Sequence, residues 1–381
     1  MKILNVNCTI DKETGGGTAE RTLKMSESLH LAGHDCAILS LDIGTEKKAD
    51  ITSEIETILL PCILKRFYIP AFSWKSLKKI KNVIVGSDIV HLMSHWTIIN
   101  AIVYIFVKIY RKKYVICPAG AMVVFGRNKL FKKVYNFIIG KSIIRNASAC
   151  IAITKDEIEQ FGRYGVKKKY ITHIPNGVSS GDFEITEYKD FRKQFNLPQK
   201  PFILFIGRLN LIKGPDLLLK AYIKAREDLK EYTLVFAGPD EGLQADLQKR
   251  VTKLRLESHI KFIGYLNQEQ KSRAYHESAF VVIPSRHEAM SIVVLEAGIV
   301  KRAVLLTNQC GVDEVEICNG GLVVPASADE ISVGLIKMTH KLKNINDNMG
   351  KNLYRYINNH YTWSTITKKF IALYSEILSR N

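Results

Sequence analysis

The sequence lacks the motifs that mark several well-known classes of protein. Its seven cysteines are odd in number and scattered, and no Cys-x-x-Cys pair is present. This excludes a cysteine-based metal site and favours reduced thiols in a cytosolic protein over a disulfide framework. The zinc-protease motif His-Glu-x-x-His and the phosphate-binding P-loop are absent, and no Asp-x-Asp pair ends a hydrophobic strand. The sequence therefore predicts neither a metal nor a cofactor.

Long hydrophobic runs are also missing. The longest, "IINAIVYIFV" at 98–107, is about half of what a bilayer crossing needs, so we expect a buried helix there. The opening "MKILNVNCTI" has one lysine and an alternating pattern, which favours a first strand over a signal peptide. With 381 residues, 46% hydrophobic and 24% charged, the chain is typical of a soluble protein with two domains.

Acidic residues are scarce in the first half. The formal net charge is +18, and residues 1–180 hold 27 Lys and Arg against 14 Asp and Glu, a net of +13. Between Asp88 and Asp156 there are eleven basic residues and no acidic one. Such a surface attracts anionic lipid, nucleic acid or phosphorylated substrates, and charge alone does not choose among them.

Short apolar runs alternate with amphipathic stretches in both halves, which predicts an α/β protein with two doubly wound Rossmann-like domains facing a cleft. "HIPNGVSSGDFE" at 173–184 is rich in turn residues and is the expected linker. We therefore place an N-terminal domain at 1–180 and a C-terminal one at 181–361. "YTWSTITKKFIALYSEIL" has a helical apolar stripe and predicts a closing helix at about 362–381.

Two cations lie where a strand is expected to end and a helix to begin. "FIGRLNLIKGPD" carries Arg208 and Lys213 in a glycine-containing loop. In doubly wound sheets ligands collect at the carboxyl ends of the strands, where helix N-termini favour anions. Arg208 and Lys213 are therefore candidates for holding a diphosphate, and two solvated surface cations are the alternative.

Two glutamates stand in the otherwise apolar stretch "SRHEAMSIVVLEAG". If a helix begins just after Glu288, the amides of Met290, Ser291 and Ile292 point outward unpaired and can meet a diphosphate or a sugar hydroxyl. Glu296 then lies two turns further on, roughly 12 Å away by helix rise. Two carboxylates at that spacing suit two hydroxyl-bearing groups, whereas the alternative is a helix cap and a solvated side chain.

Weaker signals come from the first half. "ETGGGTAER" follows the first strand, and Gly16 and Gly17 permit close backbone approach to a ligand, although such a run often marks only a turn. His91 and His95 lie near an expected strand end. They are candidates for a cleft, with a hydrogen-bonded structural role as the alternative.

Taken in order, these segments resemble the retaining glycosyltransferases of family 4, which have the GT-B fold. "PSRHEAMSIVVLEAGIVKRAVLLT" resembles the family's E-x7-E motif, with Glu288 and Glu296 in its two places. "GRLNLIKGPDLLLKAY" resembles its Gly-Arg-Leu and Lys-Gly segment, "GGTAER" its N-terminal glycine loop, and "HIPNGV" the approach to its linker. The resemblance covers nearly the whole chain.

The resemblance implies roles for these residues. Glu288 would contact the transferred sugar at the reacting carbon and is the expected catalytic residue, while Glu296 would bind the ribose. Arg208 and Lys213 would hold the donor diphosphate. Gly264 and Tyr265 in "FIGYL" would lie against the base. The family's final helix returns to the N-terminal domain, which would make the domains discontinuous.

One segment departs from the family pattern. Many relatives carry a histidine beside the donor sugar in the segment matching "CPAGAM", where this chain has Ala119 before Gly120. The acceptor or sugar side of the site would then be formed by Ala119 and Gly120 together with another polar partner, for which His95 is the candidate.

The sequence thus predicts a retaining, metal-independent glycosyltransferase. It would use a nucleotide diphosphate sugar and a saccharide or polyprenyl-diphosphate-linked acceptor, in the assembly of a bacterial surface polysaccharide. The basic block at 108–145 predicts peripheral attachment to the anionic inner face of the cell membrane, with a solvated basic face as the alternative. Two rival functions are a GT-B-fold nucleotide-sugar epimerase and a nucleic-acid-binding protein that uses the basic half.

Overall fold

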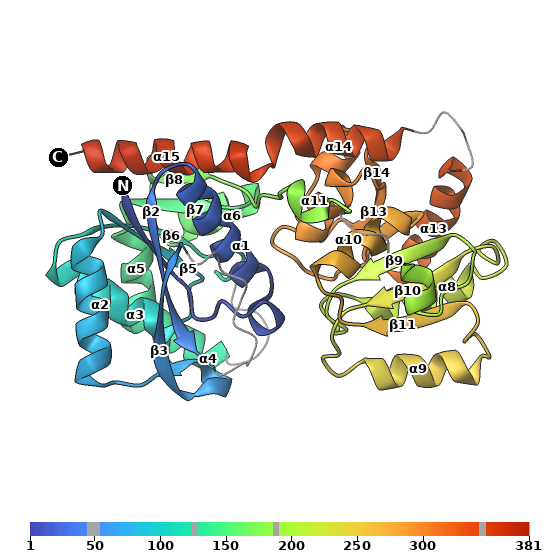
Figure 1. Cartoon of the computed structure of the whole chain (residues 1–381), viewed down its shortest axis with the longest axis horizontal. Coiled ribbons are helices and arrows are strands. Elements are labelled where there is room, and N and C mark those ends of the chain that lie inside the picture. The colour runs from blue at the N-terminus through green and yellow to red at the C-terminus, as the bar shows by residue number, and fades with distance from the viewer. Residues whose placement is uncertain (44–53, 123–128, 186–189, 343–347, 381) are drawn as a thin grey trace. The chain divides into compact units, whose positions relative to one another are not determined.

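The chain folds into two compact units. The computed structural model describes residues 1–43, 54–122, 129–185, 190–342 and 348–380, apart from the side chains of 12–14 and 66. Unit 1 comprises Met1–Gly177 together with Trp363–Asn381, and unit 2 comprises Val178–Thr362 (Figure 1). The chain therefore passes between the units after Gly177 and after Thr362, where the sequence places the boundaries at 180 and 361.

Unit 1 is built on a sheet with the strand order β4-β3-β2-β1-β5-β6-β7-β8. All neighbouring pairs are parallel except β3 and β4. The strands are β1 (Lys2–Val6), β2 (Asp35–Asp42), β3 (Glu56–Leu64), β4 (Ile69–Pro70), β5 (Ile89–Met93), β6 (Lys113–Cys117), β7 (Ala149–Ala152) and β8 (Ile171–His173). The order reverses between β1 and β5, so the topological switch point of this unit lies there.

Helices connect these strands, and polar residues cap several of them. The helices are α1 (Lys12–Leu31), α2 (Trp74–Gly86), α3 (Ile98–Ile109), α4 (Lys129–Tyr135), α5 (Lys141–Arg145), α6 (Lys155–Arg163) and α15 (Trp363–Ser379), with the short turns η1 (Lys65–Phe67), η2 (Asn136–Gly140) and η3 (Lys168–Tyr170). Ser73, Thr97 and Thr154 each accept a hydrogen bond from an amide of the following helix. The hydrophobic run at 98–107 is helix α3, as predicted, and in the described part of the chain no helix is long and apolar enough to cross a membrane.

Unit 2 has a fully parallel sheet with the order β11-β10-β9-β12-β13-β14. Its strands are β9 (Phe202–Ile206), β10 (Thr233–Ala237), β11 (Ile260–Gly264), β12 (Phe280–Ile283), β13 (Val304–Thr307) and β14 (Gly321–Val324). From β9 the chain winds outward through β10 and β11, then returns to place β12 on the other side of β9. The switch point of unit 2 therefore lies between β9 and β12.

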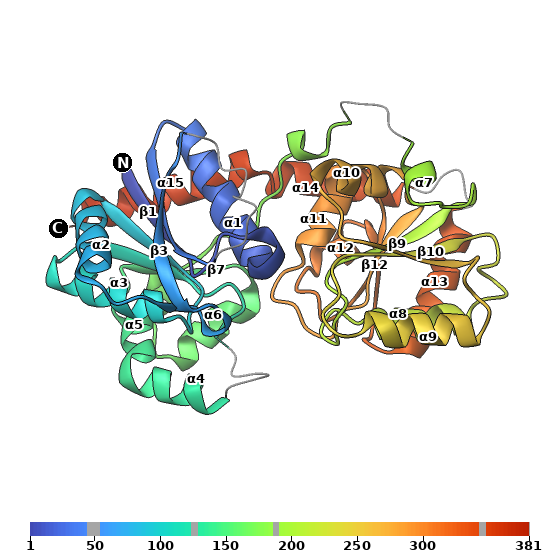
Figure 2. The same ribbon diagram turned by 60° about the horizontal axis from the view of Figure 1, so that its bottom comes forward.

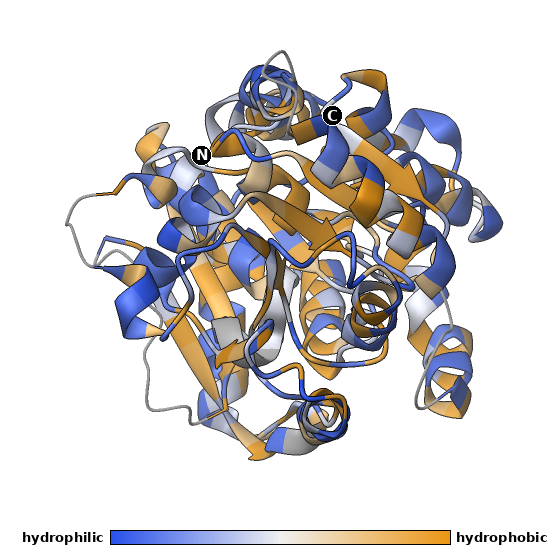
Figure 3. Ribbon diagram, turned by 90° about the vertical axis from the view of Figure 1, so that its right-hand side faces the viewer, coloured by the Kyte–Doolittle hydropathy of each residue, from blue (hydrophilic) through white to orange (hydrophobic). Residues whose placement is uncertain are grey.

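Both units thus have the doubly wound α/β architecture that the sequence predicts. The helices of unit 2 are α7 (Phe191–Gln194), α8 (Pro215–Lys224), α9 (Gln244–Lys253), α10 (Gln268–Glu277), α11 (Ile292–Ile299), α12 (Glu314–Ile317), α13 (Ala328–Leu342) and α14 (Met349–His360), with the turn η4 (Gly181–Phe183). In Figure 3 the strands are mainly hydrophobic, whereas the helices alternate between hydrophobic and hydrophilic residues.

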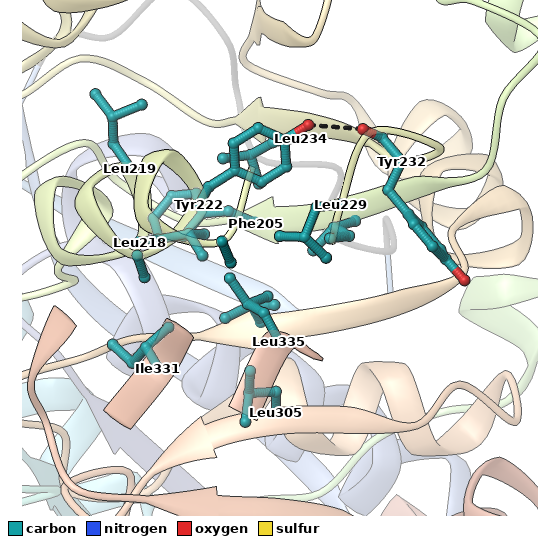
Figure 4. Packing of buried hydrophobic residues seen from close by; sticks show 14 of the residues in the cluster. Phe205, Leu218, Leu219, Tyr222, Leu229, Tyr232, Leu234, Leu305, Ile331 and Leu335 are labelled. Carbon is teal, nitrogen blue, oxygen red and sulfur yellow. Dashed lines mark hydrogen bonds between the residues drawn. The ribbon is translucent and has the colours of Figure 1, made fainter. Parts of the chain in front are cut away.

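The core of unit 2 forms where α8 and α13 pack on the sheet. Phe205, Leu305 and Leu335 are buried in it, and the Tyr222 hydroxyl donates a 2.7 Å hydrogen bond to the Tyr232 carbonyl (Figure 4). Because a buried hydroxyl without a partner is costly, this bond satisfies the polar end of a side chain that otherwise fills the apolar interior.

Helix α15 completes unit 1. Its Tyr374 hydroxyl is hydrogen-bonded to His91 Nδ1 over 2.7 Å, and its Phe370 ring lies 5.6 Å from the buried Arg21 guanidinium. Arg21 in turn donates to the carbonyls of Ile174 and Pro175, immediately before the chain leaves the unit. The last helix is therefore an integral part of the first unit's interior.

The buried histidines predict a loss of stability in mild acid. Burial lowers the pKa of His91 to about 3 and that of His95 to about 4, from an ordinary value of 6.5. Below about pH 6.5 the unfolded chain binds protons that the folded chain refuses, so the stabilisation present above that pH declines as the pH falls toward 4. We expect each histidine to lower the free energy of unfolding by about 1.4 kcal/mol between about pH 7.5 and pH 5.5.

Thermal unfolding at those two pH values checks this expectation. In His91→Asn, the loss of unfolding free energy between about pH 7.5 and pH 5.5 should be about 1.4 kcal/mol smaller than in the unchanged chain. Comparing the variant with the unchanged chain isolates His91 from the other titrating groups, and an identical loss in the two proteins would contradict the assignment.

Candidate active site

The switch point of unit 2 brings two predicted loops together. Strands β9 and β12 are hydrogen-bonded neighbours, with Ile203 opposite Phe280, so the loops that follow them leave from adjacent points of the same sheet edge. The first loop carries Arg208 and Lys213, and the second carries Glu288. A ligand at this edge is expected from the topology alone.

Lys213 and Glu288 form an ion pair at this point. Lys213 Nζ lies 2.8 Å from Glu288 Oε2, with 23% and 8% of the two side chains exposed. The Ser285 hydroxyl donates to Oε1 of the same carboxylate, and the Lys213 amide donates to Asn210 Oδ1 over 2.9 Å. Ser285 therefore fixes the carboxylate and Asn210 fixes the Lys213 backbone, and the ion pair between the two residues is largely shielded from solvent.

A second ion pair fixes the two loops to each other. Arg286 donates to both oxygens of Asp216, at 2.8 and 2.7 Å, and to the Leu211 carbonyl at 2.6 Å. The Arg286 guanidinium accordingly lowers the pKa of Asp216 against the opposing effect of burial. The sequence does not predict this pair, because nothing in the spacing of residues 216 and 286 indicates contact before the strand order is known.

Arg208 has a different partner. Its Nη1 lies 2.9 Å from Glu241 Oε1, and Asn210 donates to Glu241 Oε2 over 2.6 Å. Arg208 and Glu241 are 40% and 39% exposed, so this pair is solvated and weak. The Arg208 guanidinium is therefore held at the rim by a contact that an anionic ligand can replace at little cost.

Glu296 is buried and has two protein partners. Lys271 Nζ donates to its Oε1 over 2.6 Å and the Tyr275 hydroxyl to its Oε2 over 2.5 Å. Both partners lie on α10 four residues apart, which places them on one helix face. The carboxylate retains lone pairs for another donor, such as a ribose hydroxyl, and that role stays a prediction.

The predicted helix start is wrong. Helix α11 begins at Ile292, so Glu288 precedes the helix and the 12 Å spacing drawn from helix rise does not apply. The Ser291 amide is also not free, because it donates to the Cys310 carbonyl over 2.9 Å. This pairing, together with that of the Glu288 amide and the Gln309 carbonyl, holds residues 288–291 outside the helix. Of the three predicted amides, Ile292 lies in the first helical turn.

Three glycines end successive strands of this sheet. Gly207, Gly238 and Gly264 have φ angles of +154°, +137° and +71°. The Gly238 amide donates to the Gly264 carbonyl over 2.7 Å, and a Cβ added at Gly238 would lie 2.0 Å from the Gly207 carbonyl oxygen. Only glycine fits at Gly238, because any other residue would bring its Cβ against the Gly207 carbonyl. The carboxyl ends of these three strands therefore present bare backbone next to Tyr265, whose side chain is about half exposed.

The remaining predicted residues lie in unit 1. Gly16 interrupts helix α1 with φ +53° and ψ −143°, and Gly17 is exposed. The helix begins at Lys12 instead of after the glycines, so the glycine run is a kink within it. Gly16 and Gly17 thus present bare backbone at the switch point of unit 1, and their contact with a donor stays a prediction.

His95 is buried, with none of its surface exposed. Its Nε2 is hydrogen-bonded to Asn136 Oδ1 over 3.0 Å, and its ring packs against Trp96, Tyr135 and Tyr164. This environment favours the structural alternative for His95. His91 is likewise part of the core.

The segment around Ala119 and Gly120 has unusual backbone geometry. Ala119 and Gly120 have φ angles of +49° and +87°, and the Gly120 amide donates to Glu157 Oε1 over 2.5 Å. Burial raises the pKa of Glu157. Ala119 and Gly120 are half-buried, and their contact with a sugar stays a prediction. In the part of the chain that the structure describes, no group of three or more His, Cys, Asp or Glu side chains could hold a metal ion.

Two protein-family models match the chain, and they meet near residue 181, close to the point after Gly177 where the chain leaves unit 1. The family model Glycosyltransferase Family 4 matches residues 15–181, and the model Glycosyl transferases group 1 matches residues 187–356. The chain is 29% identical over 259 residues to an uncharacterized glycosyltransferase of Methanocaldococcus jannaschii, covering 66% of this chain and 64% of that one. It is 24% identical to the alpha-D-kanosaminyltransferase of Streptomyces kanamyceticus, over 48% of each chain. These matches span between about half and two thirds of the relatives' own lengths.

Solved structures share the fold over essentially the whole chain. Sucrose-phosphate synthase from Thermosynechococcus elongatus matches with a TM-score of 0.80 and 18% identity, covering 100% of both chains. HepE from Anabaena, in complex with UDP and glucose, matches with 0.79 and 17% over 99% of this chain and 100% of that one. WaaG, a glycosyltransferase involved in lipopolysaccharide biosynthesis, matches with 0.69 and 17% over 100% of both. The two halves of the chain thus match two glycosyltransferase family models, and the chain shares the GT-B fold of these solved structures.

Proposed function

We propose that this protein is a retaining, metal-independent transferase that moves a sugar from a nucleotide diphosphate sugar to a saccharide or lipid-linked saccharide acceptor. The observation that carries the proposal is the Lys213–Glu288 ion pair at the switch point of unit 2. An ammonium suits a departing diphosphate, and a carboxylate beside it suits the positive charge that develops on the sugar. HepE, which has the same fold, has been solved with UDP-glucose, which supports the donor class.

The arrangement of charges suggests how the donor is held. Lys213 exchanges its contact with Glu288 for a phosphate oxygen, and Arg208 leaves the solvated Glu241 for another. Glu288 stays hydrogen-bonded to Ser285 and faces the sugar. Because Arg286 and Asp216 tie the two loops together, the backbones that carry Lys213 and Glu288 keep their spacing when the ligand enters. The base of the nucleotide binds beside Tyr265, against the uncharged strand ends formed by Gly207, Gly238 and Gly264.

The transfer step follows from these positions. The acceptor oxygen forms a bond to the anomeric carbon while the bond from that carbon to the diphosphate oxygen breaks. The acceptor proton passes to the leaving phosphate oxygen on the same face of the sugar, so the configuration is retained and no separate general base is needed. Glu288 stabilises the developing charge and does not attack.

We place the reaction in the assembly of a bacterial surface polysaccharide, at the inner face of the cell membrane. The support is the basic first half of the chain and the fold shared with WaaG, which acts in lipopolysaccharide biosynthesis. Expected acceptors are polyprenyl-diphosphate-linked saccharides, whose diphosphate and lipid both complement a basic surface with apolar side chains.

A donor panel tests the proposal. Nucleotide sugars that differ in base and sugar are incubated with lipid-linked acceptors, and the anomeric configuration of the product is read by proton NMR. We expect one donor to give a product of unchanged configuration, at the same rate with and without a metal chelator. An inverted product or a chelator-sensitive rate would contradict the mechanism.

The same samples separate the rivals. An epimerase would convert the donor alone into a stereoisomer without acceptor. A nucleic-acid-binding protein would leave every donor intact and retain an oligonucleotide in a salt-dependent way.

A further inference from the structure

Large apolar side chains are exposed on one short basic segment of unit 1. The segment comprises α4 and η2, and we call it the α4–η2 segment. Its exposed apolar residues, with the fraction exposed, are Leu130 (75%), Phe131 (45%), Val134 (46%), Phe137 (89%) and Ile138 (72%). Soluble proteins scatter such side chains singly, so this concentration marks an interaction surface.

The segment is firmly held by its other face. Tyr135 is buried, donates a 3.0 Å hydrogen bond to the Thr97 carbonyl, and packs edge-on against Trp96. Asn136 is hydrogen-bonded to His95 and donates to the Tyr164 hydroxyl over 2.8 Å. The exposed apolar side chains therefore belong to an ordered surface at the carboxyl edge of the sheet, where β5 ends.

A second exposed apolar group lies at the same edge. It surrounds the end of β3 and the start of α2, and its members are Ile63 (64%), Leu64 (50%), Phe67 (55%), Phe72 (63%) and Trp74 (89%). Strands β3, β2, β1 and β5 are parallel, so the end of β3 and the end of β5 share one edge of the sheet. Figure 1 shows the end of β3 and helix α4 on the lower side of unit 1, where Figure 2 also shows helix α4.

Lysines accompany both groups. The α4–η2 segment and its flanks carry Lys129, Lys132, Lys133 and Lys141, and the second group is accompanied by Lys65, Lys75 and Lys78. No acidic residue occurs between Asp88 and Asp156 to balance the first set. Apolar side chains that would enter hydrocarbon thus alternate with cations that would stay among anionic headgroups.

We infer that this edge of unit 1 docks on a bilayer containing anionic phospholipid, with Phe137 and Ile138 entering the interface. The inference rests on the transferase function proposed above and names the surface by which unit 1 meets the membrane. A protein partner fits less well, because lysine is depleted in protein interfaces. A second copy of the chain would bring like charges together. Nucleic acid would explain the lysines and leave the exposed leucine, valine and isoleucine without a role.

Vesicle sedimentation with the full chain tests the inference. The vesicles are neutral phosphatidylcholine, or phosphatidylcholine with about a third phosphatidylglycerol. We expect binding to the anionic vesicles only, with release as salt rises from about 0.1 to 0.5 M. A Phe137→Ser, Ile138→Ser variant should bind at least tenfold more weakly, and Lys132→Gln with Lys133→Gln about fivefold more weakly per lysine.

A matched control is available in unit 2. Ile317 is 70% exposed, like Ile138, but lies beside Glu314 and Glu316, so Ile317→Ser should leave vesicle binding unchanged. The inference is overturned if anionic vesicles fail to sediment the protein, if the serine variant binds like the unchanged chain, or if an oligonucleotide displaces the vesicles. Nucleoside diphosphate binding, measured on the same variants without lipid, reports on unit 2 alone. It thus separates failure of this inference from failure of the proposed transferase function.

Discussion

Glu288→Gln should lower the rate of sugar transfer by about 10²–10³-fold while leaving the affinity for the nucleoside diphosphate nearly unchanged. Two unit charges about 4 Å apart interact by about 4 kcal/mol at an effective dielectric constant of 20, and each 1.4 kcal/mol changes a rate tenfold. The Glu288 side chain is 8% exposed and fixed by Ser285, so the amide keeps the shape and the hydrogen bond from Ser285 but loses the charge and the ion pair with Lys213. The loss therefore falls on the transition state.

Turnover and calorimetric affinity, measured on the same samples, check this expectation. Asp329→Asn is the matched control, because Asp329 pairs with Lys224 over 2.9 Å but is 77% exposed. It should change neither quantity. A Glu288→Gln enzyme that turns over at the original rate, or one whose only defect is weak nucleotide binding, would show that the carboxylate is not used in the chemical step.

Gly311→Ala should destabilise unit 2 by about 3 kcal/mol or more. Gly311 has φ +65°, and a Cβ there would lie 1.7 Å from the Ala289 carbonyl oxygen. That oxygen belongs to backbone held by the Glu288–Gln309 and Ser291–Cys310 hydrogen bonds, so it cannot move aside as a side chain would. The substitution must separate two paired segments next to the site or force the loop into another conformation.

Urea unfolding, followed by a probe in unit 2, measures the effect. Gly242→Ala serves as the control, because its φ is +100° but no heavy atom lies within 4 Å of an added Cβ. It should cost only the backbone strain of about 1–2 kcal/mol. Equal costs at the two positions would mean that the close approach at Gly311 relaxes freely and does not constrain the Glu288 loop.

The sequence predicts the architecture and singles out the charged residues that follow the strands of unit 2, for a clear physical reason. Parallel strands buried on both faces give continuous apolar runs, and the loops at their carboxyl ends carry residues that the core does not need. Arg208, Lys213 and Glu288 stand out as charged residues directly after such runs. Glu296 stands out as a carboxylate among apolar neighbours, which requires partners somewhere in the fold.

The missed residues are those whose role depends on strand order. Lys271 and Tyr275 reach Glu296 from another helix, and Arg286 reaches Asp216 from another loop, so no local pattern identifies them. The start of α11 was also misplaced, because the pairing of residues 288–291 with residues 309–310 overrides the helical propensity of the local sequence.

The proposed function depends on contact between Lys213 and a diphosphate, and calorimetric titration with nucleoside diphosphates measures that contact. Lys213→Ala should bind about 10–100-fold more weakly than the unchanged chain, because a hydrogen bond to a charged group contributes about 1.5–3 kcal/mol. Lys224→Ala, which removes an exposed lysine at the far end of helix α8, should bind as before. Equal dissociation constants for Lys213→Ala and the unchanged chain would show that Lys213 does not hold the diphosphate.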